Sequence, residues 1–386
     1  MKNILVFSLA YYPVEGGAEI ALRETMGRLR NFNFYILTHR FHCDHPAFEE
    51  KNNVKIFRLG RGGLNPHDAS LVEKILFVFR AYCQANILEQ ERSFSLIWSM
   101  MAAYAGVAAR FFKGKYPDKP LFVSIQEGDS EEHMESDKLG LINFWIKRIV
   151  RRADCIQVIS NYLKDFIFKK GARCPIVVIP NGVNLELFDK DWPSEDLVFL
   201  KNRLGIKDGE KVVITTSRLA YKNGVDTLIR AVALLDRLFK LLIVGEGADR
   251  AALEGLTQSL DLTDRVIFVG SILQSQLPLY LKLSDVFVRP SRSEGLGNSF
   301  LEAMAAGVPI IGTAVGGIPD FLKDCETGWF VPVDDPAATA AKIQSVLANK
   351  TEAQAVVQKA RLLVREKYSW DQVAAWIGEI INSQLR

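Results

Sequence analysis

Short apolar segments alternate with helical segments along most of this 386-residue chain, and the series occurs twice. Parallel strands need a crossover connection that is usually a helix, so the alternation predicts doubly wound parallel sheets. The expected strands are Ile4–Ser8, Phe34–Leu37, Val54–Arg58, Leu96–Trp98, Leu121–Ile125, Cys155–Ile159 and Val177–Ile179, then Lys211–Thr215, Lys240–Val244, Val266–Val269, Val286–Arg289, Pro309–Gly312 and Gly328–Val331. A polar segment, residues 189–194, has the character of a linker. We expect two α/β domains, residues 1–188 and 189–368, and a terminal helix over residues 369–386.

The segment Ser291–Ile311 carries the clearest functional pattern in the chain. A predicted strand leads into a loop with Gly295 and Gly297, and a helix follows. The first amides of a helix lack internal partners and carry partial positive charge, so such a loop suits a phosphate group. Glu294 precedes the loop and Glu302 lies in the helix, and carboxylates accept hydrogen bonds from sugar hydroxyls. The segment predicts a site for a ligand with phosphate and sugar. If the glycine loop is considered without the glutamates, the alternative is an ordinary α/β crossover in which the glycines serve only tight turns.

The two glutamates have seven residues between them. This stretch resembles the E-x7-E signature of the retaining, family 4 glycosyltransferases of the GT-B fold. The resemblance implies that Glu294 lies against the donor sugar as a catalytic residue and that Glu302 holds the ribose hydroxyls of the nucleotide. It also implies that the sugar and the diphosphate are bound by the loop and the helix start, at Gly295, Leu296, Gly297 and Asn298.

Two cations, Arg218 and Lys222, lie in the loop after the first strand of the second half. Arg supplies a planar fork of donors and Lys a point charge, so the pair could clamp a diphosphate. The alternative is an ordinary solvated loop, since Lys and Arg are usually exposed. The spacing resembles the R-x3-K diphosphate clamp of the same family, which favours a role in donor binding.

The first half repeats the arrangement of strand, glycine loop and helix, with Gly16 and Gly17 at the helix start. The resemblance implies that this loop approaches the diphosphate and the acceptor, with Gly17 in the catalytic group. Gln126 follows a predicted strand at a position where many relatives have a His that contacts the donor sugar. The Gln amide can donate a hydrogen bond but cannot titrate, and we assign it the corresponding role. Glu127, Asp129 and His133 lie close by in the sequence.

Composition excludes several other classes of protein. A net charge of +3 does not indicate a nucleic-acid-binding protein. Five cysteines without a C-x-x-C pair argue against disulfides and structural zinc and fit a reducing cytoplasm. The apolar start is followed by Tyr11-Tyr12-Pro13 in place of a cleavage site, so we interpret it as a strand. No apolar run approaches the roughly 20 residues that span a bilayer.

The segment Leu139–Arg152 combines aromatic and basic residues. Phe144 and Trp145 lie near one side of the predicted helix, among four Lys and Arg residues. This pattern suits contact with an anionic membrane on its inner face. A helix that covers the sheet and exposes its charged side is the alternative.

The resemblance extends from the first glycine loop to the last helix, and it implies two domains that face each other across a cleft. The first would bind the acceptor and the second the nucleotide sugar, and the last helix would return to the first domain. We expect transfer of a hexosyl group from a nucleotide-diphosphate sugar to a hydroxyl of a carbohydrate or lipid-linked acceptor, with retention of configuration, in polysaccharide or glycolipid synthesis. No D-x-D sequence follows a strand, so neither a metal nor another cofactor is expected. A nucleotide-sugar epimerase and a catalytically silent nucleotide-sugar-binding subunit remain alternatives.

Overall fold

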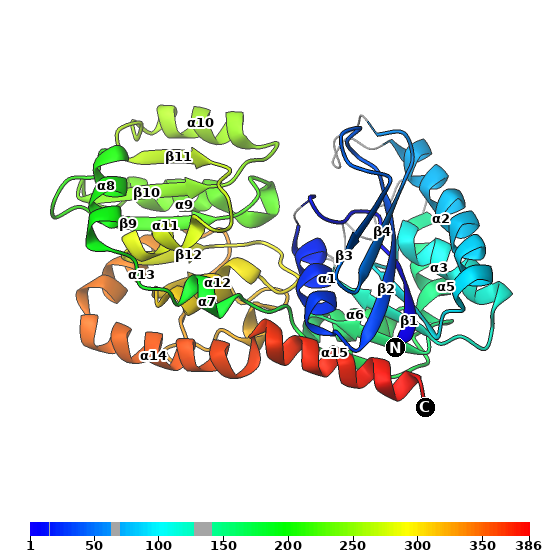
Figure 1. The fold of residues 1–386 in the computed structure, drawn as a ribbon. Coiled ribbons are helices and arrows are strands. Elements are labelled where there is room, and N and C mark those ends of the chain that lie inside the picture. The colour runs from blue at the N-terminus through cyan, green and yellow to red at the C-terminus, as the bar shows by residue number, and fades with distance from the viewer. Residues whose placement is uncertain (15, 63–69, 127–140) are drawn as a thin grey trace. The chain divides into compact units, whose positions relative to one another are not determined.

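The computed structural model describes residues 1–14, 16–62, 70–126 and 141–386 and forms two compact units (Figure 1). Unit 1 comprises Met1–Asn181 and Trp370–Arg386, and unit 2 comprises Gly182–Ser369. Each unit has one sheet, parallel apart from one edge strand of unit 1, with helices on both faces, which confirms the predicted class of two doubly wound α/β domains.

The described part of unit 1 contains a sheet with the strand order β3-β4-β2-β1-β5-β6-β7-β8. Neighbouring strands are parallel except β3, which pairs antiparallel with β4 at the edge. The sequence did not predict β3, because its four residues, FEEK, contain a single apolar side chain. The strands are β1 (Lys2–Phe7), β2 (Phe32–His39), β3 (Phe48–Lys51), β4 (Val54–Leu59), β5 (Leu96–Met100), β6 (Leu121–Ile125), β7 (Cys155–Val158) and β8 (Ile176–Val178).

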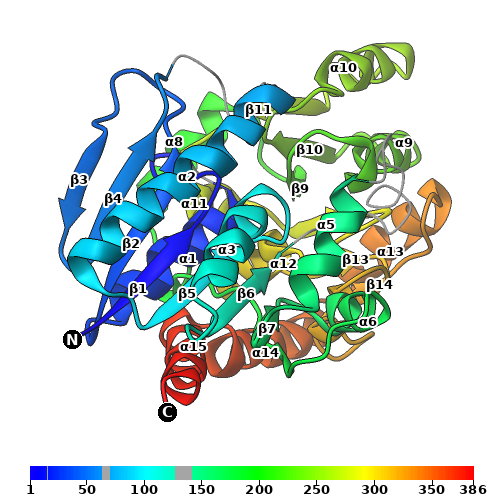
Figure 2. The same ribbon diagram turned by 90° about the vertical axis from the view of Figure 1, so that its right-hand side faces the viewer.

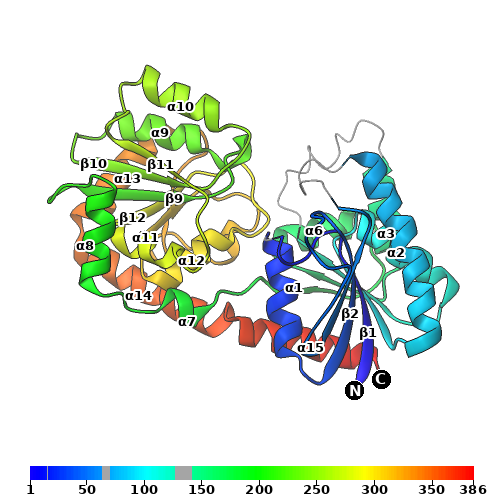
Figure 3. The same cartoon turned by 45° about the horizontal axis from the view of Figure 1, so that its top comes forward.

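Helices cover both faces of this sheet, with α1 on one side and α2 and α3 on the other (Figure 3). Ile4 and Val6 of β1 pack into one core with α1 and α15, whereas Phe7 contacts Phe112 of α3 at a ring distance of 6.1 Å. The pleat of a strand sends alternate side chains to opposite faces, so β1 supplies both cores. The helices are α1 (Gly17–Arg28), α2 (Leu71–Arg92), α3 (Tyr104–Lys115), α5 (Leu141–Val150), α6 (Asn161–Lys169) and α15 (Trp370–Gln384).

The sheet of unit 2 has the order β11-β10-β9-β12-β13-β14, and all its neighbouring strands are parallel. One face of this sheet forms a hydrophobic core with helices α9, α10 and α13. On the other face, Phe300 of α12 packs against Phe287 of β12. The strands are β9 (Lys211–Thr216), β10 (Phe239–Val244), β11 (Val266–Gly270), β12 (Val286–Arg289), β13 (Ile310–Gly312) and β14 (Trp329–Phe330). The helices are α7 (Leu185–Phe188), α8 (Ser194–Arg203), η1 (Tyr221–Asn223), α9 (Val225–Ala233), α10 (Arg250–Ser259), α11 (Leu277–Leu283), α12 (Asn298–Ala306), η2 (Ile318–Asp320), α13 (Pro336–Ala348) and α14 (Lys350–Lys367).

The order of strands reverses once in each sheet. The reversal lies between β1 and β5 in unit 1 and between β9 and β12 in unit 2. Ligands of open parallel sheets bind at the carboxyl ends of the strands beside such a reversal. The loops after β1, β9 and β12 carry the predicted glycines, cations and Glu294, so the topology places these residues at the expected positions of their sheets.

Helix α5 corresponds to the predicted aromatic and basic segment. Its buried side is formed by Ile146, Ile149 and Val150, whereas Phe144 is 46% exposed and lies outside that side. Helix α5 lies beside α3, which lies beside α2 (Figure 2). In the part of the chain that the structure describes, no helix combines the length and the apolar character needed to cross a bilayer.

Candidate functional site

Two loops meet at the strand-order reversal of unit 2. The loop after β9, residues 217–224, is called the clamp loop, and the loop after β12, residues 290–297, is called the glycine loop. The backbone amide of Arg292 donates to the carbonyl of Lys222 at 2.7 Å, and the Arg292 side chain donates to the carbonyl of Tyr221 at 2.6 Å. The predicted cations and Glu294 are therefore on segments that hydrogen-bond to each other.

Glycines permit this close packing of the loops. Gly224 ends the clamp loop with φ of 66°, and a side chain there would collide with the carbonyl oxygen of Pro290. Gly316, with φ of 54°, lies equally close to the carbonyl of Glu294, which accepts a hydrogen bond from the amide of Gly317 at 3.1 Å. Only glycine adopts this conformation and allows this approach at little cost.

The glycine loop ends at the start of α12. Gly297 precedes the helix with φ of 96°, Asn298 is its first residue, and no side chain of the described residues caps it. Leu296 is buried and anchors the loop, while Gly295 is also buried. An uncapped helix start beside glycines offers backbone amides to an anion. The predicted phosphate-binding residues are thus brought together at one helix start.

Glu294 is held by a cation that we did not predict as part of the site. Arg289, the last residue of β12, donates from Nη2 to Glu294 Oε2 at 2.6 Å. The same guanidinium donates to Asn223 in the clamp loop and to Ser299 in α12, each at 2.7 Å. Arg289 is only 7% exposed, so the ion pair is mostly removed from water. A charge-assisted bond of this kind fixes the direction of the carboxylate.

Glu302 lies in α12, four residues after the first helical residue. Gln274, in the connection between β11 and α11, donates to Glu302 Oε1 at 3.4 Å. Burial raises the pKa of Glu302 to about 7, while the Gln274 hydrogen bond and the charge of Arg289 act in the opposite direction. The side chain is an acceptor for hydroxyl groups when ionised, and near neutral pH a ligand could shift its ionisation.

The predicted Arg218 differs from Arg292, another arginine of the same region. Arg218 is exposed and Lys222 is partly exposed. Arg292, by contrast, is occupied by ion pairs with Asp226 and Asp334 at 2.8 and 2.6 Å. Arg292 therefore stabilises the loops, whereas Arg218 has its guanidinium on the surface. The role of Arg218 and Lys222 as a diphosphate clamp stays a prediction.

The loop after β1 in unit 1 also contains glycines, and a carboxylate lies at the start of the helix that follows it. Gly16 precedes α1 and Gly17 is the first helical residue. Glu19 Oε2 lies so close to Gly16 that a side chain at that position would meet it at 2.5 Å. Burial raises the pKa of Glu19, and hydrogen bonds from the backbone amides of Glu19 and Gly16 oppose this shift. The predicted anion-binding amides are thus engaged by a residue of the same helix.

Gln126 follows β6 and accepts a hydrogen bond from the side-chain amide of Asn181 at 2.9 Å. With its oxygen engaged, the Gln126 amide nitrogen remains as the donor expected for a sugar hydroxyl. The side chain lines a cavity of about 10 Å³, together with residues of α1 and α15. Glu127, Asp129 and His133 lie outside the described residues.

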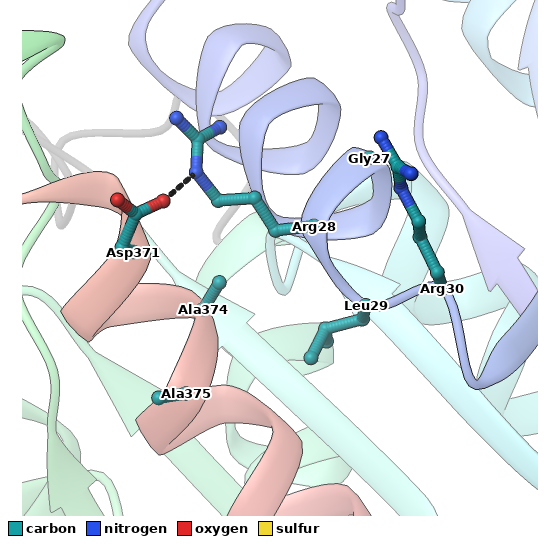
Figure 4. Close-up of a pocket in the computed structure, with 7 residues that line it drawn as sticks. All are labelled: Gly27, Arg28, Leu29, Arg30, Asp371, Ala374 and Ala375. Carbon is teal, nitrogen blue, oxygen red and sulfur yellow. Dashed lines mark hydrogen bonds and ion pairs between the residues drawn. The ribbon is translucent and has the colours of Figure 1, made fainter.

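The opposite end of α1 borders a larger pocket, of about 420 Å³ (Figure 4). Arg28, at the end of α1, donates to Asp371 of α15 at 2.7 Å across this pocket. The remaining lining is small or aliphatic apart from Arg30, so the pocket offers few directed polar groups. Its main structural contribution is the ion pair that fixes α1 against α15.

Sequence reasoning missed Arg289, Gln274 and Glu19. Arg289 had a detectable signal, because an arginine ends an otherwise apolar strand, VFVR. Glu19 belongs to the GGAE segment but carried no separate pattern, and Gln274 carried none. Among the described residues, no three His, Cys, Asp or Glu side chains come together as a metal-binding group.

Comparisons with known proteins give a consistent family. The family model "Glycosyltransferase Family 4" matches residues 15–187, and the model "Glycosyl transferases group 1" matches residues 199–363. An uncharacterized glycosyltransferase of Methanocaldococcus jannaschii is 36% identical over 201 residues, which are 52% of each chain. The GDP-mannose-dependent alpha-(1-6)-phosphatidylinositol monomannoside mannosyltransferase of Mycobacterium tuberculosis is 30% identical over 248 residues, 61% of this chain and 64% of that one. The matches thus span about half to two thirds of these curated relatives.

Solved structures agree over the whole chain. Sucrose-phosphate synthase from Thermosynechococcus elongatus superposes with a TM-score of 0.86 at 24% identity, covering 99% of both chains. Anabaena Alr3699/HepE in complex with UDP and glucose superposes with a TM-score of 0.78 at 20% identity, covering 99% of this chain and all of that one. At these identities the likeness shows the fold alone, whereas the two family models account for most of the sequence. The chain therefore belongs to the glycosyltransferases of the GT-B fold, in the group related to family 4.

Proposed function

We propose that this protein transfers a hexosyl group from a nucleotide-diphosphate sugar to an acceptor hydroxyl, with retention of configuration. The supporting observation is the meeting of the clamp loop and the glycine loop, where Arg292 donates to Lys222 at 2.7 Å and Glu294 adjoins an uncapped helix start. Phosphate is favoured at that helix start, and Arg218 and Lys222 lie on the adjoining loop. Glu302, on the same helix, supplies the acceptor for ribose.

The chemistry follows from charge. The bond between the anomeric carbon and the donor phosphate breaks, and the acceptor oxygen bonds to that carbon on the same face. The leaving diphosphate takes the proton of the acceptor hydroxyl. Its negative charge is stabilised by Arg218, Lys222 and the amides of residues 295–298, so we propose that no metal or other cofactor is required. Glu294, held by Arg289, stabilises the positive charge that develops on the sugar.

The names of the relatives suggest the kinds of donor and acceptor. The Mycobacterium tuberculosis relative is GDP-mannose-dependent and acts on a phosphatidylinositol mannoside, and an alpha-monoglucosyldiacylglycerol synthase of Streptococcus pneumoniae is 31% identical over 178 residues. Both names specify a hexose and a lipid. We propose by analogy a lipid-linked or carbohydrate acceptor, in glycolipid or polysaccharide synthesis.

The decisive experiment compares Glu302→Gln with Glu294→Gln. Glu302→Gln should weaken binding of the sugar-free nucleotide and of the full donor alike, since both carry ribose. Glu294→Gln should spare the sugar-free nucleotide and lower kcat by roughly 100-fold, because its contribution grows as charge develops. Calorimetric titration measures binding, and nucleotide release with acceptor measures turnover. Glu326→Gln, an exposed glutamate of the same unit, is the matched control.

The outcomes separate the alternatives. Equal loss of nucleotide affinity in both variants, with lower melting temperatures, would mean that both glutamates only brace the loop. An isomerised sugar without transfer would indicate an epimerase, and binding without any turnover would indicate a silent subunit. A thermal-shift screen with ADP, GDP and UDP should come first, because it identifies the nucleotide to use.

Unit 1 also carries a surface suited to an anionic membrane. An aromatic row crosses three helices from Tyr82 on α2 through Phe111 on α3 to Trp145 on α5, with ring distances of 6.5 and 5.6 Å. Further exposed apolar side chains lie on α2, namely Leu71, Val72, Ile75, Leu76 and Phe79. The pKa of Arg110 is lowered by burial and by Arg148 and Arg152, so three cations lie close together beside the row.

Aromatic and cationic residues on one surface favour a bilayer with anionic lipid. We therefore propose peripheral contact at the inner, cytoplasmic face of the membrane. Arg148→Glu should reduce cosedimentation with phosphatidylglycerol vesicles by roughly fivefold or more, given about 1 kcal/mol per basic residue. Arg203→Glu, an exposed arginine of unit 2, is the control. Equal binding of wild type and Arg148→Glu to these vesicles would contradict the membrane contact.

A further inference from the structure

Arg289 is a buried charge beside the predicted site of unit 2, and the predicted roles of the site residues do not account for it. Its side chain ends β12 and is almost fully removed from water. A buried charge costs free energy unless opposite charges and hydrogen bonds compensate for it. Arg289 Nε is buried and lacks a hydrogen-bond partner among the described residues. Compensation is thus incomplete, so stability alone gives a poor reason for an arginine at this position.

The two terminal nitrogens of Arg289 connect three segments. Nη1 donates to Ser299 Oγ at 2.7 Å, in the first turn of α12. Nη2 donates to Asn223 Oδ1 at 2.7 Å and to Glu294 Oε2 at 2.6 Å. Asn223 in turn donates to the carbonyl of Arg218 at 2.5 Å. A guanidinium holds its donors in a rigid fork, so Glu294 is oriented relative to the clamp loop and to the helix start.

Arg289 also acts on the second glutamate. Its charge lowers the pKa of Glu302, which burial raises. The other group that contacts Glu302 is the neutral Gln274, from the connection between β11 and α11. A single buried cation therefore influences both carboxylates, through an ion pair with Glu294 and through a longer-range charge interaction with Glu302.

We propose that Arg289 is a positioning residue for the transfer reaction: it binds one oxygen of the Glu294 carboxylate so that the other is presented to the donor sugar. This inference rests on the proposed function. An oriented carboxylate stabilises charge on the sugar without rearranging as the charge develops, whereas one that rotates freely must reorganise first. Loss of Arg289 should therefore appear in kcat and should depend on the presence of Glu294.

A double-mutant cycle tests this dependence. Arg289→Met should lower kcat by roughly 100-fold in the wild-type background, similar to the loss in Glu294→Gln. In the Glu294→Gln background the same substitution should change kcat by less than about threefold, because residues that act as a unit are not additive. If the fold-losses in kcat of the two single variants multiply to give the loss in the double variant, the two residues act independently and the proposal is overturned.

A binding measurement separates charge from scaffolding. Without Arg289 the pKa of Glu302 should rise, so the pH midpoint for binding the sugar-free nucleoside diphosphate should move upward. At a pH well above both midpoints, where Glu302 is ionised in both proteins, Arg289→Met and wild type should bind within about threefold. An affinity loss of equal size at every pH would mean that Arg289 only braces the loops.

Two further variants control for folding. Arg265 is a comparably buried arginine of unit 2 that donates to the carbonyls of Phe239, Val232 and Asp236. Arg265→Met should lower the melting temperature without moving the pH midpoint or coupling to Glu294→Gln. If Arg289→Met fails to fold, Arg289→Lys keeps the charge and loses the fork. It should retain the pH midpoint and lower kcat by about tenfold, and an unchanged kcat would overturn the proposal.

These results also distinguish two kinds of failure. Absence of turnover by the wild type with every nucleotide sugar would count against the transfer reaction itself. Wild-type turnover together with an unchanged Arg289→Met would count against Arg289 alone.

Discussion

The loop after β1 and the loop after β12 both lead into a helix through a glycine, yet their carboxylates are held differently. In unit 1, Glu19 turns back to the start of α1, where the backbone amides of Glu19 and Gly16 bind it. In unit 2, Glu294 is bound by Arg289 and the start of α12 carries no side-chain cap among the described residues. The carboxylate occupies the helix start in the first loop and leaves it open in the second.

The difference between the two carboxylates shows how a nearby cation can keep a helix start open by binding the carboxylate itself. A helix start attracts any carboxylate that can reach it. In unit 2 Glu294 is bound by the buried Arg289, whose full positive charge attracts a carboxylate more strongly than the partial charge of a helix start does. We therefore expect a substrate phosphate to bind more readily at the start of α12, which has no side-chain cap among the described residues, than at the start of α1, where it would have to displace Glu19.

The largest expected effect comes from removing the two predicted clamp cations of the second site. Arg218→Ala or Lys222→Ala should weaken nucleoside diphosphate binding by roughly 10- to 100-fold, since a charge-assisted contact contributes about 1.5–3 kcal/mol. Arg230→Ala, an exposed arginine on α9, should bind like the wild type. Calorimetric titration provides the affinities, and unchanged values in both clamp variants would refute the clamp.

The second prediction concerns pH. Because the pKa of Glu302 is raised to about 7, its carboxyl group is mostly protonated at pH 6 and mostly ionised at pH 8. Only the ionised form can accept hydrogen bonds from both ribose hydroxyls, so affinity should increase about tenfold from pH 6 to pH 8. The dependence should disappear in Glu302→Gln. A flat profile in the wild type would show that ribose binding does not need the carboxylate.

A smaller effect should come from the first loop. Glu19→Gln removes the negative charge from the start of α1, which should lower KM for the donor by about two- to fivefold. Glu91→Gln, at an exposed position near the end of α2, serves as control. Initial-rate measurements at several donor concentrations suffice. An increased KM would mean that Glu19 itself binds substrate, and the contrast between the loops would then have another origin.

The smallest effect is expected from chelation. The second site has two predicted cations and vacant amides for the diphosphate, so turnover in excess chelator should equal that of untreated protein. The control is untreated protein with added magnesium. Complete loss of turnover, restored by magnesium or manganese, would show that a metal supplies charge that we assign to Arg218 and Lys222.

The fold was largely predictable because strands buried on both faces are continuous apolar runs. The edge strand β3 was not, since FEEK has one apolar side chain and its contacts, such as Phe48 with Phe57 and Glu49 with Arg58, are made to another strand. The candidate site was predictable where residues follow one another closely, as from Glu294 to Glu302. Arg289 had a signal, as the charged end of an apolar strand, but its link to the clamp loop was not predictable, because its partner Asn223 lies 66 residues away.

The two glycine loops illustrate the same limit. Glu19 and Glu294 both accompany a glycine loop, and nothing in their neighbouring residues shows which one turns toward the amides. The direction of the Glu294 carboxylate depends on its contact with Arg289 and on burial, and both arise only when the unit packs. Sequence therefore located both loops, while the direction of each carboxylate needed the structure.

Helix α15 has a consequence for the order of synthesis. Its residues close the core that Ile4 and Val6 begin, and Arg28 is paired with Asp371 across the whole intervening chain. A ribosome completes all of Gly182–Ser369 before it makes that helix. The part of the first sheet's apolar face that α15 covers is therefore completed only after all the strands of unit 2 have been made, so the unit that is started first is finished last.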